Sequence, residues 1–221
     1  MRAIRPGNGP ARNRVTPLGD IVAAPGRGAW TGNRGRLHEG TGSRDIVRDH
    51  LGKTWLICAL SFKGRCSPQW QPGHYTHLFF LDEAVGFAAG HRPCAECRHP
   101  AFAAYRDAWA AAHGGQRPYA REMDSRLHAE RLRDRHGRRV LTAMPWASLP
   151  DGVFVLAGQD PAVVAGGHLT RYDRVSNAYG ERRPRPRDGT AAVITPPAAV
   201  AVLRAGYQVQ VDAAATASRF R

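Results

Sequence analysis

The chain has 221 residues, of which 43% are hydrophobic, a composition that suits a globular protein with one sizeable core or two small ones. It carries 32 basic and 18 acidic residues, a net charge of +14, and its only lysines are Lys53 and Lys63. No run of about 18 apolar residues occurs, and the first residues contain no apolar signal core. We therefore expect no membrane span, no secretory signal and a cytoplasmic location.

The arginine-rich charge favours a polyanionic partner, because guanidinium groups bind phosphates bidentately and a positive field concentrates nucleic acid. Arginine also replaces lysine in GC-rich genomes without any functional cause, so a protein partner stays open as the alternative. We expect nucleic acid, with DNA favoured, as the partner. The candidate nucleic-acid contacts are three arginines close to cysteines in the sequence: Arg65, Arg92 and Arg98.

The first third of the chain predicts a loop-rich arm followed by a β-hairpin. Residues 1–50 show no sustained apolar period, which predicts an arm that is partly loop, and residues 30–38 are expected to be its best-ordered part. Residues 55–62 favour a strand, and the Lys63-Gly64 pair favours a two-residue turn. Residues 65–70 are then expected to return as the second strand of the hairpin.

The middle of the chain predicts three helices. After a β-favouring run at residues 75–81, Asp82 is expected to cap a short helix over residues 83–89, which Gly90 closes. Pro100 begins a second helix, and Gly114-Gly115 ends it. Its apolar residues recur at helical spacing and are expected in the core: Phe102, Tyr105, Trp109 and Ala112. A third, highly charged helix is expected on the surface over residues 121–136.

Beyond residue 146 the pattern changes to short strands separated by glycine-rich turns, which predicts a small β-rich unit. Strands are expected at residues 153–157, 161–165, 191–195 and 207–211, with a helix at 198–205 and an extended arginine-rich segment at 182–187. The expected fold class is therefore α+β. Three regions are expected: an arm at 1–50, a metal-binding unit at 51–145 and the β-rich unit at 146–221.

Four cysteines, Cys58, Cys66, Cys94 and Cys97, lie within 40 positions of one another. Cys94 and Cys97 form a Cys-x-x-Cys motif, in which both sulfurs can bind one ion. We expect zinc rather than redox chemistry, because a helix precedes this motif instead of following it directly. Cys58 and Cys66 are expected as further ligands, although a regular two-residue hairpin would place them on opposite sheet faces.

Residues 79–97 read FFLDEAVGFAAGHRPCAEC and resemble the metal-binding domain of the Ada DNA-repair methyltransferases, where a helix ending in Ala-Ala-Gly leads into Arg-Pro-Cys-x-x-Cys. The Cys66-Ser67-Pro68 segment falls where that domain has Cys-x-Pro, so the resemblance covers about residues 55–98. The whole chain also resembles a family of uncharacterised bacterial proteins that share the block Gly-His-Arg-Pro-Cys-x-x-Cys-Arg.

The resemblance to the Ada domain implies a β-hairpin with helices, a zinc ion held by four cysteines, and a methyl-accepting thiol at Cys66. The family's second cysteine corresponds to Trp70 here, so Cys58 or a histidine would have to complete the coordination. The candidate histidines are His74, His77, His91 and His99.

Three functions are weighed on these grounds. The first is a zinc-stabilised, nucleic-acid-associated module linked to DNA repair or modification, and the second is a structural zinc protein with a protein partner. The third is a zinc deaminase-like hydrolase that uses Cys94, Cys97, His128 and Glu130. In this chain the motif order is reversed relative to deaminases, and His128 and Glu130 would point about 200° apart on one helix.

Overall fold

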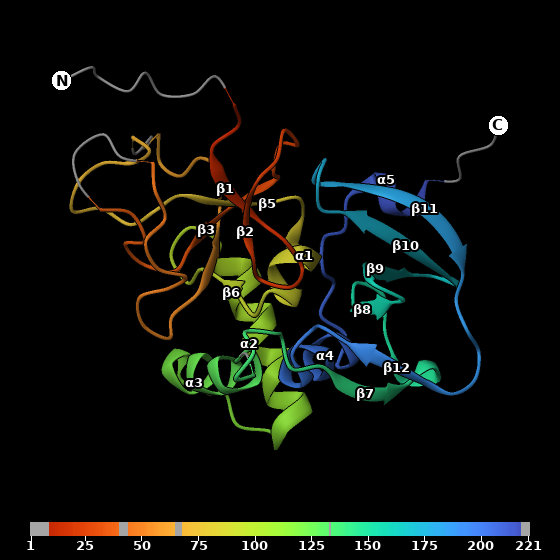
Figure 1. The fold of residues 1–221 in the computed structure, drawn as a ribbon. Coiled ribbons are helices and arrows are strands. Elements are labelled where there is room, and N and C mark those ends of the chain that lie inside the picture. The colour runs from red at the N-terminus through yellow and green to blue at the C-terminus, as the bar shows by residue number, and fades with distance from the viewer. Residues whose placement is uncertain (1–8, 40–43, 65–67, 133, 218–221) are drawn as a thin grey trace.

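Two six-stranded sheets lie beside one another, with helices packed against them (Figure 1). The computed structural model describes residues 9–39, 44–64, 68–132 and 134–217. The expected α+β fold class is confirmed, since both sheets and helices contribute to the structure.

The first sheet has the strand order β2-β1-β5-β3-β4-β6. Its strands are β1 (Arg12–Val15), β2 (Ile21–Ala23), β3 (Trp30–Asn33), β4 (Leu56–Cys58), β5 (Leu78–Phe80) and β6 (Arg92–Pro93). The β1–β5 and β4–β6 pairs are parallel, and the other pairs are antiparallel. Three of these strands, β1, β2 and β3, come from the arm expected to be partly loop. Strands of three or four residues are too short to show a period in the sequence.

The expected hairpin at residues 55–70 differs from the observed pairing. Lys63 and Gly64 do form a turn, with φ of +52° and +66°, but β4 ends at Cys58. It pairs with β3 on one side and with β6 on the other. Of the expected return strand, residues 65–67 lie outside the described residues, and 68–70 form no strand. The partners of β4 come from distant segments, which no local pattern reveals.

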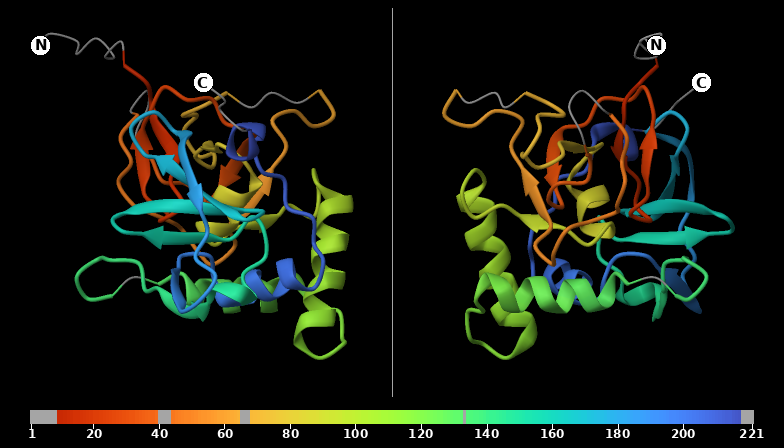
Figure 2. Two further views of the ribbon diagram at one scale, coloured as in Figure 1. Left: turned by 90° about the vertical axis from the view of Figure 1, so that its right-hand side faces the viewer. Right: turned by 60° about the vertical axis from the view of Figure 1, so that its left-hand side comes forward.

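The three predicted helices are present as α1 (Glu83–Ala88), α2 (His99–His113) and α3 (Ala120–Glu130). Asp82 caps α1 by accepting a hydrogen bond from the Val85 N–H at 2.8 Å, and Gly114 ends α2 in the left-handed conformation. The right-hand view of Figure 2 shows α2 upright and α3 running across the bottom. Helix α3 ends before the expected residue 136, because Arg131 turns into the protein and donates to the Gly90 and Lys53 carbonyl oxygens.

The second sheet has the order β11-β10-β9-β8-β12-β7, with antiparallel pairs throughout. Its strands are β7 (Thr142–Pro145), β8 (Phe154–Ala157), β9 (Asp160–Ala165), β10 (His168–Asp173), β11 (Ala178–Pro184) and β12 (Thr190–Val193). A 3₁₀ turn, η1 (Trp146–Ser148), and the helices α4 (Pro197–Arg204) and α5 (Ala213–Thr216) complete the fold. The strands expected at 153–157, 161–165 and 191–195 are confirmed within two residues, whereas β7, β10 and β11 are additional.

The expected last strand at residues 207–211 is not formed, because buried carboxylates of α1 bind this segment instead of a strand partner. The Tyr207 hydroxyl donates to Glu83 Oε1 at 2.8 Å, and the Gln210 N–H donates to Glu83 Oε2 at 3.0 Å. Asp82, the N-cap of α1, accepts from the Asp212 N–H at 2.9 Å directly after this segment, and from the Tyr179 hydroxyl of β11 at 2.7 Å. These two acids tie the first half of the chain to the second.

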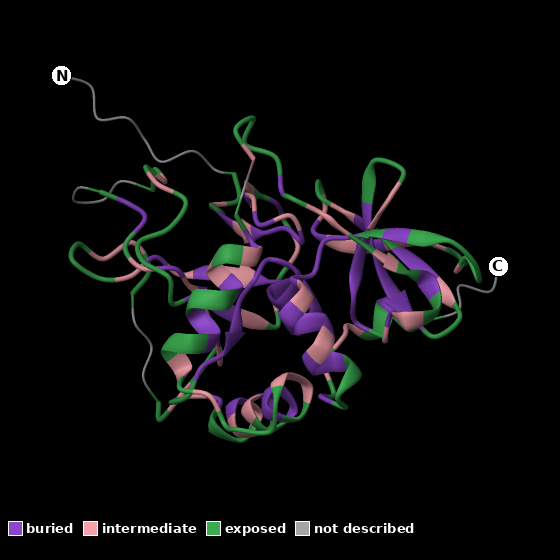
Figure 3. Cartoon of the chain, turned by 90° about the horizontal axis from the view of Figure 1, so that it is seen from below, coloured by how far each residue is buried: buried purple, intermediate pink, exposed green. Residues whose placement is uncertain are grey.

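The buried hydrophobic side chains form one continuous cluster that runs from β1 to α5. Helix α4 packs against α2 and α3, and α1 packs against both β5 and β8. Figure 3 shows the buried residues concentrated toward the middle of the molecule, with exposed residues in the peripheral loops. The expected core stripe of α2 is confirmed for Phe102, Tyr105 and Trp109, whereas Ala112 is half-buried.

Candidate metal centre

Three cysteines from distant parts of the sequence meet at one edge of the first sheet. The Sγ atoms of Cys58, Cys94 and Cys97 all lie within 4.8 Å of one another. Thiolates that share a zinc ion lie roughly 3.8 Å apart, as bonds of about 2.3 Å in a tetrahedron require. The cluster therefore could hold a metal ion with only a slight contraction.

The parallel pairing of β4 with β6 explains why these thiols meet. Leu56 lies beside Arg92 and Ile57 beside Pro93, so the next residue of each strand is a cysteine. The Cys94 N–H donates to the Ile57 carbonyl oxygen at 3.0 Å and fixes this register. The turn that follows then brings back Cys97 just before α2 begins. The expectation that Cys58 joins the Cys-x-x-Cys motif agrees with this geometry.

Hydrogen bonds within the cluster favour one ionised thiol in the absence of a metal. The Cys58 thiol, together with the backbone N–H groups of Cys97 and Glu96, lowers the pKa of Cys94 to about 5. The same hydrogen bond to Cys94 and burial raise the pKa of Cys58, and burial raises that of Cys97. The Ala59 N–H also donates to Cys97 Sγ at 3.3 Å. A bound cation would replace the remaining thiol protons.

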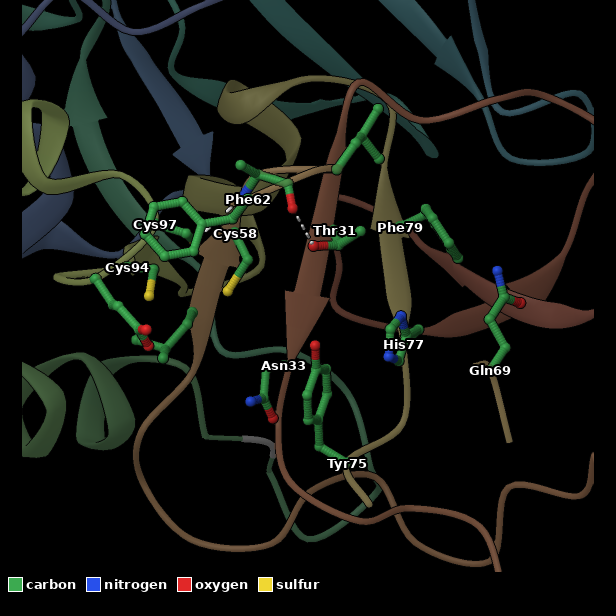
Figure 4. Close-up of a pocket in the computed structure, with 14 residues that line it drawn as sticks. Thr31, Asn33, Cys58, Phe62, Gln69, Tyr75, His77, Phe79, Cys94 and Cys97 are labelled. Atoms are coloured by element: carbon green, nitrogen blue, oxygen red, sulfur yellow. Dashed lines mark hydrogen bonds between the residues drawn. The ribbon is translucent and has the colours of Figure 1, made fainter. Parts of the chain in front are cut away.

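The thiols line a cavity of about 450 Å³ whose other walls come from β3, β5 and the segment before β5 (Figure 4). Thr31 and Asn33 line it from β3, and Tyr75 and His77 precede or adjoin β5. The Tyr75 and His77 rings stack with their centroids 4.7 Å apart. Thr31, Asn33 and Tyr75 were not expected at the site, since single polar residues on separate strands carry no recognisable spacing.

The remaining candidate ligands are dispersed. Cys66 lies outside the described residues. His77 lines the cavity, whereas His74 and His99 are exposed. His91 is fully buried and accepts a hydrogen bond from Arg34 Nε at 3.1 Å, and burial holds its pKa well below the usual range. Within the described part of the chain, no histidine joins the three thiols as a ligand.

The arginines expected to contact nucleic acid have other roles where the structure describes them. Arg92 is 3% exposed and forms a bidentate ion pair with Asp124. Arg98 is 8% exposed, binds Glu83 at 2.7 Å and lies over the Trp30 ring. Arg65 lies outside the described residues. Arg92 and Arg98 therefore support the fold from inside and present no guanidinium group to a partner.

The deaminase-like arrangement is not assembled among the described residues. His128 lies near His50 and Arg131, and Glu130 accepts from the Ala198 N–H at 2.8 Å. Neither residue gathers with the thiols. Glu130 and His128, the residues expected to supply the proton-shuttling carboxylate and the histidine ligand, therefore lie away from this cluster.

No protein-family profile, curated protein sequence or solved structure matches the chain. The resemblance to the Ada metal-binding domain therefore stays a prediction. Among the residues that the structure describes, no helix combines the length and the apolar character needed to cross a membrane.

Proposed function

We propose that this protein holds one zinc ion through Cys58, Cys94 and Cys97 and associates with nucleic acid. The gathering of the three thiols carries the metal proposal. Thiolates are soft ligands that select zinc among the common divalent ions, and clustered free thiols are otherwise uncommon. A bound zinc ion would offset most of the thiolate charge and link the end of β4 to the segment just before α2.

A fourth ligand is needed for tetrahedral coordination, and two sources fit the chain. One source is Cys66, and the other is a water molecule from the adjoining cavity. A fourth cysteine would close the coordination shell, as in structural zinc sites. A water ligand would leave an exchangeable position in the cavity that Tyr75 and His77 also line (Figure 4).

Cysteine variants test the metal site. We expect about one equivalent of zinc in protein purified without chelator. Cys94→Ser and Cys97→Ser should each lose the zinc, since each removes one ligand. Both variants should also be less stable, because binding free energy at a structural site is folding free energy. Elemental analysis with a circular dichroism check measures both effects. His74→Ala is the control, since His74 is exposed and is not among the residues that gather at the thiols.

Zinc below roughly a tenth of an equivalent, or full retention of zinc in Cys97→Ser, would contradict the proposal. The Cys66→Ser variant decides the fourth ligand. Strongly weakened zinc binding identifies Cys66 as that ligand, whereas unchanged binding excludes Cys66 and leaves the position to water or to His77, which lines the same cavity.

The charge of the protein supports the nucleic-acid part of the proposal. The net charge is +14, and several arginines are exposed on the described surface. They include Arg12, Arg27, Arg36, Arg44, Arg121, Arg135, Arg183 and Arg187. These side chains are spread over both halves of the chain, which predicts contacts with phosphates rather than with particular bases.

Fluorescence anisotropy with labelled duplex and single-stranded oligonucleotides tests this part. Affinity should fall steeply between about 50 and 200 mM salt, because each neutralised phosphate releases condensed counterions. Replacing Arg183 and Arg187 by glutamine should flatten the salt dependence by up to about two units of slope. Absence of binding at the lower salt concentration would refute the nucleic-acid association and favour a protein partner.

A further inference from the structure

A second cavity, of about 210 Å³, lies beside Trp55 and shares no lining residue with the metal centre. Three arginines line it: Arg34 after β3, Arg131 at the end of α3, and Arg139 before β7. They are 1%, 4% and 8% exposed, respectively. The guanidinium carbons of Arg34 and Arg131 lie 4.0 and 3.8 Å from the centre of the Trp55 ring. Buried positive charge is therefore concentrated at one small cavity.

Backbone carbonyl groups hold these arginines in place. Arg131 donates to the carbonyl oxygens of Gly90 at 2.7 Å and Lys53 at 2.6 Å, and Arg139 donates to the Ala88 carbonyl at 3.1 Å. For Arg131 both of these acceptors are carbonyl oxygens, which satisfy N–H groups without neutralising the charge. Arg92 and Arg98, by contrast, are buried against carboxylates.

Arg131 has an unused donor. Its Nε is buried and has no hydrogen-bond partner among the described residues. The only acidic residue in the cavity lining is Asp49, which is exposed, and the nearby Asp124 is already bound by Arg92. A buried guanidinium group with an unfilled donor is expected to bind an anion, because an unmade hydrogen bond to a charged group is costly.

We propose that this cavity binds a phosphate group, with Arg34, Arg131 and Arg139 supplying its positive charge. The volume exceeds the roughly 30 Å³ that one water molecule occupies, so a tetrahedral oxyanion and its waters fit. A phosphate dianion matches several guanidinium groups better than a single carboxylate does, and the planar guanidinium group binds it bidentately. This site is independent of the zinc proposal.

The surroundings agree with such a ligand. Burial lowers the pKa of Arg131 to about 9, as is typical of a cation whose charge is incompletely balanced. His50 and His128 also line the cavity, with ring centroids 5.5 Å apart. Because His128 Nδ1 faces the Arg131 guanidinium at 3.3 Å, the neutral ring carries its proton on Nε2 and can donate from there.

Isothermal titration of the 221-residue protein, as purified, with inorganic phosphate in a chloride buffer tests the proposal. The key variant is Leu132→Glu, which places a negative charge in the cavity lining at a side chain that is 49% exposed. Circular dichroism checks that this variant folds. We expect saturable binding with one site per chain, and an affinity at least roughly tenfold lower in Leu132→Glu.

Val175→Glu is the matched control, since it makes the same charge change at an 80% exposed residue in the turn between β10 and β11. It should bind phosphate like the wild type. Arg131→Gln should also lose binding, with circular dichroism to confirm folding. Because Leu132 does not line the metal cavity, a loss in Leu132→Glu cannot reflect phosphate bound to zinc.

A nucleoside 5′-monophosphate distinguishes two sources of the phosphate group. Tighter binding of the nucleotide at the same site identifies a phosphomonoester ligand, and binding of inorganic phosphate alone identifies the free ion. Either result supports the proposal. The proposal is overturned if neither compound binds saturably, or if Leu132→Glu and Val175→Glu bind phosphate with equal affinity.

Discussion

Replacing Asp124 by asparagine should destabilise the protein strongly, because it leaves the buried Arg92 charge without its partner. Asp124 accepts from Arg92 Nε at 2.7 Å and from its Nη2 at 2.9 Å, and the two side chains are 6% and 4% exposed. Breaking one partner of a buried ion pair typically costs about 3–5 kcal/mol. For a chain of this length that corresponds to a fall in melting temperature of roughly 6–20 °C.

The assay is thermal and denaturant unfolding of Asp124→Asn beside a matched pair on the same helix. Arg126 forms an exposed pair with Glu130 at 3.0 Å, with its side chain 53% exposed, so Arg126→Ala should cost no more than about 0.5 kcal/mol. Replacing both Arg92 and Asp124 by apolar residues of similar volume should recover much of the loss. A cost below about 1 kcal/mol for Asp124→Asn would refute this reasoning.

Two further predictions concern α1 and its cap. Gly86→Ala should lower the free energy of unfolding by about 1–3 kcal/mol, because the added Cβ would lie 2.5 Å from Ile57 Cδ1. Gly167→Ala is the control and should be nearly neutral, because a Cβ added there would meet no atom within 4 Å. Burial raises the pKa of Asp82 to about 6, above its value of about 3.9 in the unfolded chain. The folded protein therefore holds the Asp82 proton more tightly than the unfolded chain does. The stability that this proton contributes is fully present below about pH 4 and is lost as the pH rises through about 6. In Asp82→Asn the melting temperature should not show this fall with rising pH. A melting temperature that depends on pH as it does in the wild type would contradict the inferred raised pKa of Asp82.

Local signals in the sequence located the middle of the structure. The Asp82 cap, Gly90 and the Gly114 stop each depend on residues a few positions apart, and α1 and α2 begin and end close to where these signals place them. The Cys-x-x-Cys motif is local in the same sense. Elements that depend only on neighbouring residues could therefore be predicted.

Pairing between distant segments could not be predicted. The short strands β1, β2 and β3 form because they share a sheet with β4 and β5, and β4 meets β6 rather than the segment after Lys63-Gly64. That parallel pairing, and not a hairpin, brings Cys58 to the motif. The buried roles of Arg92 and Arg98 also depend on carboxylates in other elements. The net charge of a sequence counts buried, paired arginines together with exposed ones, so it does not show which arginines can reach a partner.

X-ray absorption at the zinc edge of protein purified without chelator tests the central claim most directly. We predict a shell of three or four sulfur atoms at about 2.3 Å, three of them from Cys58, Cys94 and Cys97. The absence of zinc, or a first shell of only nitrogen and oxygen at roughly 2.0–2.1 Å, would contradict the account.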